Sequence, residues 1–185
     1  MLQRLRPFLL SLTLFTLLPM SPSRAADESV KISKACDLPA MKAFAFWVGA
    51  WKVVSQVKAS PTEDQWQEIK ADDNIHYILD GCALQQNYQD SYIKGTSLTT
   101  YLPDKKMWQQ VWIDNTMPNL ISFLGEFKDG KMVMLGQATQ QGKAVTNRQT
   151  YYNITADKVD YLYEQSMDGG KTFVAIIKGV YTRKL

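Results

Sequence analysis

The chain of 185 residues has little histidine and cysteine, two residue types that commonly bind metals and haem or act as catalytic groups. It contains one histidine, His76, and two cysteines, Cys36 and Cys82. These residues are too few and too poorly spaced for a zinc site, and no Ser–His–acid motif surrounds His76. We therefore expect no cofactor and no metal. We interpret His76 as a surface or hydrogen-bonded residue, with a catalytic base as the alternative.

The chain also lacks a hydrophobic run long enough to cross a bilayer. Residues 8–20 form an apolar stretch of 13 residues behind Arg4 and Arg6, and Ser23-Arg24-Ala25 follows. A spanning helix needs about 20 residues, whereas this pattern is typical of a cleavable secretory signal. We predict a signal peptide over residues 1–25, cleaved between Ala25 and Ala26. The mature protein is then periplasmic or secreted, without membrane attachment.

An excess of basic charge is missing once the signal is removed. The first 25 residues hold three arginines and no acids, so residues 26–185 carry 18 basic and 18 acidic side chains. A neutral chain without basic clusters does not favour nucleic-acid binding. The acidic residues Glu68, Asp72 and Asp73 lack the spacing of a calcium loop, and we interpret them as part of a solvated strand and turn.

The two cysteines gain significance from export, because an oxidising compartment favours disulfides. We predict a Cys36–Cys82 bond, with two buried thiols as the alternative. Residues 26–36 are polar and unpatterned, which indicates a linker. Residues 37–185 are enough for one domain with a sizeable core.

Short β-rich runs separated by turn signals dominate this domain, and a long helical period is absent. Asp37 is a candidate cap for a short helix through Phe46. Asp129-Gly130 is the clearest hairpin turn. The predicted strands cover residues 49–57, 65–79, 82–89, 95–102, 107–114, 120–127, 131–138, 144–152, 158–165 and 172–183. An early helix followed by about ten meandering antiparallel strands favours an all-β, up-and-down, lipocalin-like barrel.

The alternation of residues along these strands mixes aromatic and hydrogen-bonding side chains on single faces, which is typical of a ligand pocket. An exposed sheet face is the alternative interpretation. Trp51 is placed to plug one end of the barrel. Arg148 is expected to bind an anion or to pair with Asp114 or Glu164. The full set of candidate ligand-binding residues is Trp51, Ser97, Tyr101, Trp108, Gln110, Trp112, Arg148 and Tyr163.

Residues 166–173, Ser-Met-Asp-Gly-Gly-Lys-Thr-Phe, resemble the Asp-box of sialidase-type propellers. A propeller needs several such units, and this chain has one. We therefore interpret the segment as a self-capped hairpin before the last strand, without glycosidase activity.

Several motifs occur in a recognisable order. They are Phe46-Trp47-Val48-Gly49-x-Trp51, Asp80-Gly81-Cys82-Ala83-Leu84, Gly95-x-Ser97-Leu98, Trp108-x-Gln110-x-Trp112-Ile113-Asp114, Asp129-Gly130-x-Met132-Val133, Arg148-x-Thr150-Tyr151, Glu164-x-Ser166-x-Asp168-Gly169-Gly170-Lys171-Thr172 and Gly179-x-Tyr181-x-Arg183. This set resembles a family of exported bacterial lipocalin-like, or calycin-like, domains of unknown function. The resemblance spans roughly residues 44–184 and implies a β-barrel, with little chemistry attached to it.

Three functions remain open at this level. The first is a carrier of a small, partly apolar molecule in an aromatic-lined cavity. The second is an interaction or structural domain, such as an edge-paired homodimer. The third is an enzyme acting on a small molecule, with Tyr101, His76 or Arg148 as its reactive groups.

Overall fold

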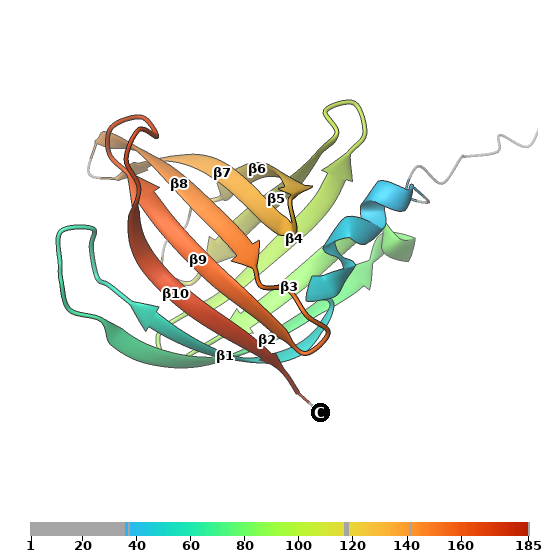
Figure 1. The fold of residues 1–185 in the computed structure, drawn as a ribbon, viewed down its shortest axis with the longest axis horizontal. Helices are drawn as coiled ribbons and strands as arrows, with labels where there is room; N and C mark the ends of the chain where they lie inside the picture. Colours follow the sequence, from blue (N-terminus) through green and yellow to red (C-terminus); the bar gives the residue numbers. More distant parts are fainter. Residues whose placement is uncertain (1–35, 37, 117–118, 141, 185) are drawn as a thin grey trace, which may run out of the picture. The chain divides into compact units, whose positions relative to one another are not determined.

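A computed structural model describes residues 36, 38–116, 119–140 and 142–184. Ten antiparallel strands form one closed barrel in the order β1-β10-β9-β8-β7-β6-β5-β4-β3-β2, as Figure 1 shows. Each strand pairs with its sequence neighbour, and β1 also pairs with β10, so that no edge is left unpaired. The strands are β1 (Gly49–Val57), β2 (Gln67–Ile78), β3 (Ala83–Gln89), β4 (Lys94–Leu102), β5 (Met107–Asp114), β6 (Ile121–Lys128), β7 (Lys131–Gln140), β8 (Lys143–Tyr152), β9 (Lys158–Ser166) and β10 (Val174–Arg183).

The predicted up-and-down barrel and its strand positions are confirmed, and so is the tight turn between β6 and β7. Asp129 and Gly130 both have positive φ angles, +52° and +71°, and Lys128 pairs with Lys131 across the turn. This backbone matches the two-residue hairpin turns that follow strand twist. Within the described residues, no helix is long and apolar enough to cross a membrane.

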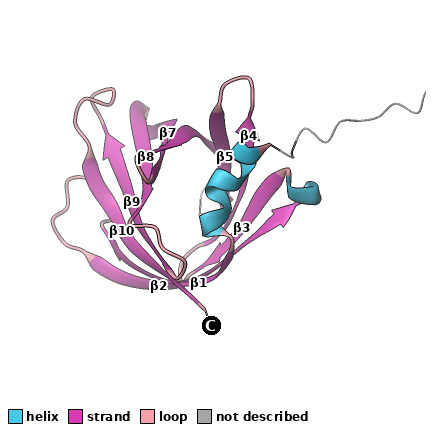
Figure 2. Cartoon of the chain, turned by 45° about the vertical axis from the view of Figure 1, so that its right-hand side comes forward, coloured by secondary structure: helices cyan, strands magenta, loops and turns pink. Residues whose placement is uncertain are grey.

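A short 3-10 helix, η1 (Pro39–Trp47), precedes the barrel and lies at its opening in Figure 2. Pro39 suits a first helical position, where a free N–H is not needed. Leu38 is the N-cap residue, and the predicted cap, Asp37, lies outside the described residues. Met41, Phe44 and Trp47 are the buried side chains of η1. A second 3-10 turn, η2 (Leu79–Gly81), joins β2 to β3.

The disulfide between Cys36 and Cys82 is present, as predicted. It joins the chain just before η1 to the start of β3, across 46 residues of sequence. A disulfide of this kind is typical of proteins that fold in an oxidising compartment.

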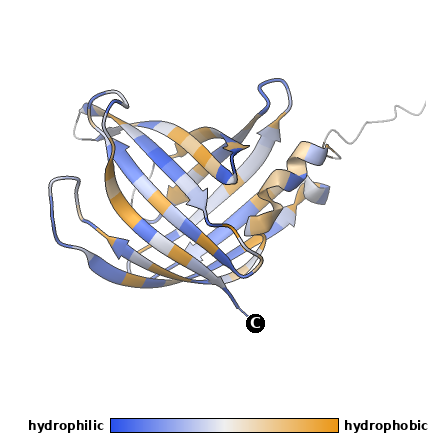
Figure 3. Ribbon diagram, in the orientation of Figure 1, coloured by the Kyte–Doolittle hydropathy of each residue, from blue (hydrophilic) through white to orange (hydrophobic). Residues whose placement is uncertain are grey.

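Alternation along the strands sorts side chains between the interior and the surface, and Figure 3 shows it as bands of contrasting hydropathy. In β1, for example, Trp51, Val53 and Ser55 are buried whereas Lys52 and Val54 are exposed. One face of each strand therefore supplies the barrel interior.

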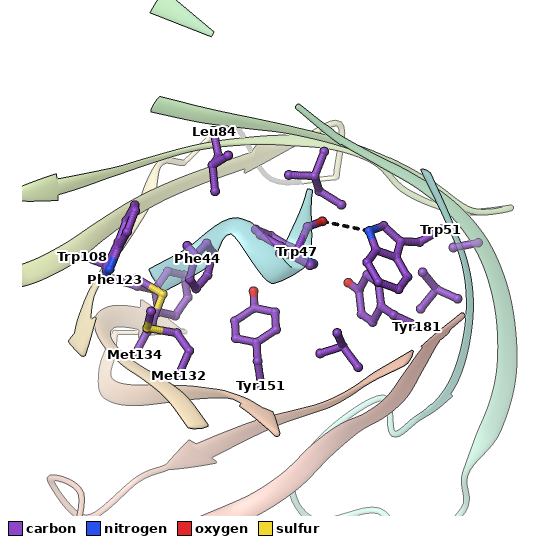
Figure 4. Packing of buried hydrophobic residues seen from close by; sticks show 14 residues of the cluster. Phe44, Trp47, Trp51, Leu84, Trp108, Phe123, Met132, Met134, Tyr151 and Tyr181 are labelled. Carbon is purple, nitrogen blue, oxygen red and sulfur yellow. Dashed lines mark hydrogen bonds between the residues drawn. The ribbon is translucent and has the colours of Figure 1, made fainter. Parts of the chain in front are cut away.

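The hydrophobic core fills the end of the barrel next to η1 (Figure 4). Phe44 stacks on Trp108 with ring centroids 5.3 Å apart and meets Tyr151 edge-on at 5.6 Å. Trp47 lies 5.1 Å from Tyr151. Met132 and Met134 are fully buried in the same cluster. This packing makes η1 a stopper that closes one end of the barrel.

Arg183, at the end of β10, locks this closed end. Its guanidinium lies over the Trp51 ring, 4.2 Å from the centroid. It donates hydrogen bonds to the carbonyl oxygens of Val48 (2.8 Å), Ala156 (2.6 Å) and Phe46 (3.4 Å). Trp51 Nε1 in turn donates to the Trp47 carbonyl at 2.8 Å. A Cβ at Gly49, whose φ is +141°, would overlap the guanidinium, so that this glycine makes room for Arg183.

Candidate functional site

The interior of the barrel contains a cavity of about 240 Å³ beyond the hydrophobic core. Its walls are inward-facing side chains, including Val53 of β1, Phe123 of β6 and Ile177 of β10. Five tyrosines are among its aromatic lining residues: Tyr88, Tyr151, Tyr161, Tyr163 and Tyr181. Ser55, Gln86, Gln110 and Gln149 contribute hydrogen-bonding groups. Apolar walls with a few placed polar groups are typical of a small-molecule site.

A chain of hydrogen bonds crosses the barrel interior beside this cavity. Tyr151 Oη donates to Gln149 Oε1 (3.0 Å), and Gln149 Nε2 donates to Gln110 Oε1 (3.0 Å). Gln110 Nε2 donates to Ser97 Oγ (3.4 Å) and Ser97 Oγ donates to Gln86 Oε1 (2.8 Å). All of these bonds run in one direction, so that each donor polarises the next.

The chain ends at Asp73 of β2, because Gln86 Nε2 donates to Asp73 Oδ2 at 2.6 Å. Asp73 is only 1% exposed, and its Oδ1 accepts no hydrogen bond of good geometry from the described residues. Burial raises the pKa of the Asp73 carboxyl to about 7, against the smaller lowering effect of the Gln86 amide. The interpretation of Asp73 as a solvated residue was therefore wrong. Asp73 shares the inner face of β2 with the buried Ala71 and Ile75.

The tyrosines remain protonated hydrogen-bonding groups at any physiological pH. Burial raises the pKa of Tyr163 to about 12. Burial also raises the pKa of Tyr151, Tyr161 and Tyr181 well above the ordinary value. Tyr161 links two of them, with ring centroids 5.1 Å from Tyr151 and 6.2 Å from Tyr181. These rings give the cavity a firm aromatic wall.

The end of the cavity away from η1 is marked by Tyr88 and Trp112, whose rings meet edge to face at 6.1 Å. Trp112 Nε1 donates to Asp114 Oδ2 at 2.8 Å, and Tyr88 Oη donates to Asp90 Oδ2 at 2.8 Å. Between them, Gly95 lies opposite both Tyr88 and Asp114 in the sheet. A Cβ at Gly95 would overlap the Trp112 ring, and so this glycine allows the indole to lie flat against the sheet.

The eight candidate site residues fall into three groups. Gln110, Trp112 and Tyr163 line the cavity. Trp51, Ser97 and Trp108 are buried inside the barrel without lining it, and Tyr101 contacts Trp108 with ring centroids 5.6 Å apart. These four lie in the core or in the hydrogen-bond chain, where they shape the cavity indirectly.

Arg148 is on the other side of the sheet, between the inward-facing Asn147 and Gln149. Its Nε donates to Glu164 Oε2 at 2.6 Å, and its guanidinium stacks on Phe173 at 3.8 Å. Of the roles considered for Arg148, the structure shows the ion pair with Glu164. The placement of Arg148 in the cavity was wrong, because alternation in β8 turns it outward.

The loop before β10 has the self-capped form predicted for it. The Asp168 carboxylate accepts hydrogen bonds from Ser166, Lys171 and Thr172. The Ser166 and Thr172 hydroxyls and nearby backbone N–H groups lower the pKa of Asp168. These bonds hold the loop in shape.

His76 is exposed on the outer face of β2. It therefore cannot serve as a catalytic base inside the barrel, as the enzymatic alternative required. Among the described residues, no group of three His, Cys, Asp or Glu side chains is placed to hold a metal ion.

Sequence reasoning missed Asp73, Gln86, Gln149 and Tyr181 as parts of the interior. The available signal was alternation with known inward residues: Asp73 is two positions from Ile75, and Gln86 is two from Leu84. Gln149 and Tyr181 likewise share their strand faces with the buried Tyr151 and Gly179.

Together, the closed antiparallel barrel, the helical stopper and the internal cavity define a calycin-like β-barrel protein. Within that class, the chain belongs to the DUF1579 family of proteins of unknown function, whose model matches residues 39–183. No protein of curated function matches the chain in sequence.

Among solved structures, the chain is similar to an S-type phycobiliprotein lyase from Guillardia theta, with a TM-score of 0.50 and 15% identity over 80% of this chain and 94% of the lyase. It also matches a protein of unknown function from the DUF3598 family of Nostoc punctiforme, with a TM-score of 0.27 and 8% identity, covering 80% of this chain and all of that one. The first likeness is one of fold.

Proposed function

We propose that the protein is an exported carrier that binds a small, partly apolar molecule inside its barrel. The observation that supports this function is the 240 Å³ cavity, lined by tyrosines and by glutamines that are already hydrogen-bonded to one another. Preformed walls lower the ordering cost of binding. Because the lyase shares only the fold, the proposal depends on the cavity itself.

Periplasmic or secreted localisation is part of the same proposal. The Cys36–Cys82 disulfide supports an oxidising compartment, and the signal pattern of residues 1–25 supports export. Gln110, Trp112 and Tyr163 are the proposed contacts among the residues predicted from sequence, with Gln149, Tyr161 and Tyr181 added by the cavity walls.

Native mass spectrometry of the protein purified from its own cells tests this function. We expect a reproducible extra mass that disappears on denaturation. In the variant Ile121→Trp, the larger side chain fills part of the cavity, and the fraction of protein that carries the ligand should fall at least tenfold. The neighbouring change Leu120→Trp should not, because Leu120 is 69% exposed and does not line the cavity.

The opposite pattern would count against a carrier. A wild-type chain that carries no extra mass, and whose melting temperature is not raised by a broad set of small molecules, would favour an interaction domain. Equal retention of the ligand by both tryptophan variants would place the ligand outside the barrel.

A further inference from the structure

The aromatic pair Tyr88–Trp112 has an unusual electronic setting. Each ring gives its one polar hydrogen to a carboxylate at 2.8 Å, Tyr88 to Asp90 and Trp112 to Asp114. Asp90 is held in place by the backbone N–H groups of Tyr92 and Ile93. Asp114 is held by the backbone and hydroxyl of Thr116. Both rings therefore face carboxylates fixed by the turns at that end of the barrel.

A ring that donates to a carboxylate becomes more electron-rich, because the hydrogen bond polarises the ring towards negative charge. Cations bind over the faces of Trp and Tyr rings through the negative ring quadrupole. Burial and Asp90 raise the pKa of Tyr88, so that its hydroxyl keeps its proton and remains the donor. The pair is thus better suited to a positive group than isolated rings would be.

The charged residues around the cavity also favour a positively charged ligand. The described residues that line it include one carboxylic acid, Asp114, and no Lys, Arg or His. Deeper in the barrel, Asp73 is a buried carboxyl, 1% exposed. Arg183 and Arg148, the two arginines with part-buried side chains, are committed to backbone carbonyls and to Glu164 respectively. An anionic ligand would find no compensating positive charge among the described residues that line the cavity.

We propose that the molecule held in the cavity is an organic cation: an ammonium group on an apolar or aromatic body, its charged head against Tyr88 and Trp112 beside Asp114. The inference rests on the proposed function and adds the charge of the ligand to it. The apolar body then lies among Tyr161, Tyr163 and Phe123, where its burial contributes the remaining affinity.

Isothermal titration calorimetry with three probes of similar size tests the sign of the charge. The probes are benzyltrimethylammonium, its neutral carbon isostere neopentylbenzene and the anion 3-phenylpropionate. A quaternary ammonium keeps its charge at every pH, so that the ligand itself does not titrate. We expect the cation to bind at least tenfold more tightly than the neutral isostere, and the anion to bind more weakly than either.

Two variants locate the head group. Asp114→Asn keeps an acceptor for the Trp112 indole but removes the charge, and it should weaken cation binding about fivefold to tenfold while leaving the neutral probe unchanged. Trp112→Leu should weaken the cation more than the neutral probe. The matched control is Glu126→Gln, which removes one acidic charge from the exposed outer face of β6 and should change neither. Circular dichroism confirms that each variant is folded.

The results distinguish a failure of the cation inference from a failure of the proposed carrier function. If the neutral isostere or the anion binds as tightly as the cation, the cavity is a binding site but the inference is wrong. The inference is also wrong if Asp114→Asn weakens binding of the cation and of the neutral probe equally. If none of the three probes binds and the native protein carries no extra mass, the proposed function fails with it.

Discussion

At the scale of the residue, Asp73 combines two properties that seldom occur together, near-complete burial and no cationic partner among the described residues. The titratable groups that face it are the hydroxyls of Tyr88, Tyr151, Tyr161 and Tyr181, and none of them carries positive charge. The carboxyl is retained at a cost in stability whenever it ionises. Asp73 ends the hydrogen-bond chain. A carboxylate only accepts hydrogen bonds, so that the NH₂ group of Gln86 must face it, and this fixes the direction of the chain.

This setting predicts an unusual dependence of stability on pH. The pKa of Asp73 is about 7 in the folded state, against an ordinary value of 3.8. Between these values the folded state binds the additional proton, so that the free energy of unfolding falls as pH rises, by at most about 1.4 kcal/mol per pH unit. In Asp73→Asn this slope should shrink, and the variant should be more stable than wild type at pH 8. Urea unfolding at pH 4.5, 6 and 8 measures it; parallel curves for the two proteins would contradict the assignment.

At the scale of the element, Arg183 of β10 ties together the exit of η1, the β8–β9 loop and the first strand. Its guanidinium serves three carbonyl groups and the Trp51 ring at once. A loss of these bonds would leave partly buried carbonyl oxygens unpaired, which costs more than the bonds contribute individually. Arg183 therefore adds polar bonds to the aromatic packing that holds η1 in the barrel.

Arg183→Met keeps the stem of the side chain and removes the guanidinium. We expect a loss of about 2–4 kcal/mol in the free energy of unfolding. Lys52→Met is the matched control, because Lys52 has one ion pair with Asp72 on the exposed outer face, and should lose only about 1 kcal/mol or less. Urea denaturation of both variants compares them; equal losses would mean that Arg183 does not lock the closed end.

At the scale of the whole molecule, the barrel is stabilised by closure of the sheet and by one covalent link. The Cys36–Cys82 disulfide closes a loop spanning 46 residues, which includes η1, β1 and β2. In the chain-entropy model such a loop contributes about 4 kcal/mol. Cys36→Ser/Cys82→Ser should therefore unfold at a lower denaturant concentration, and a reducing agent should shift wild type to the same midpoint. A midpoint unchanged by either treatment would show that the disulfide adds no stability.

Much of the fold was accessible from local patterns. The ten strands lie within about two residues of their predicted bounds, because alternation and turn residues such as Asp129-Gly130 act over a few neighbouring positions. The disulfide was also predictable, since the chain has two cysteines and the signal pattern of its first 25 residues favours an oxidising compartment. Three of eight candidate site residues, Gln110, Trp112 and Tyr163, line the cavity, because their strands' faces were sorted correctly.

The positions of the remaining site residues depended on how the sheet closes into a barrel. Alternation divides a strand into two faces but does not say which face is inside, and this ambiguity accounts for the outward Arg148 and the buried Asp73. The helix η1 fills one end of the barrel, so that Trp51 and Trp108 belong to the hydrophobic core there, whereas Trp112 lines the cavity. The amino-acid sequence by itself determined the strands, the turns and the disulfide, because those follow from nearby residues. Only the tertiary structure decided where the cavity lies and that carboxylates and aromatic rings meet there, because strands far apart in the chain bring them together.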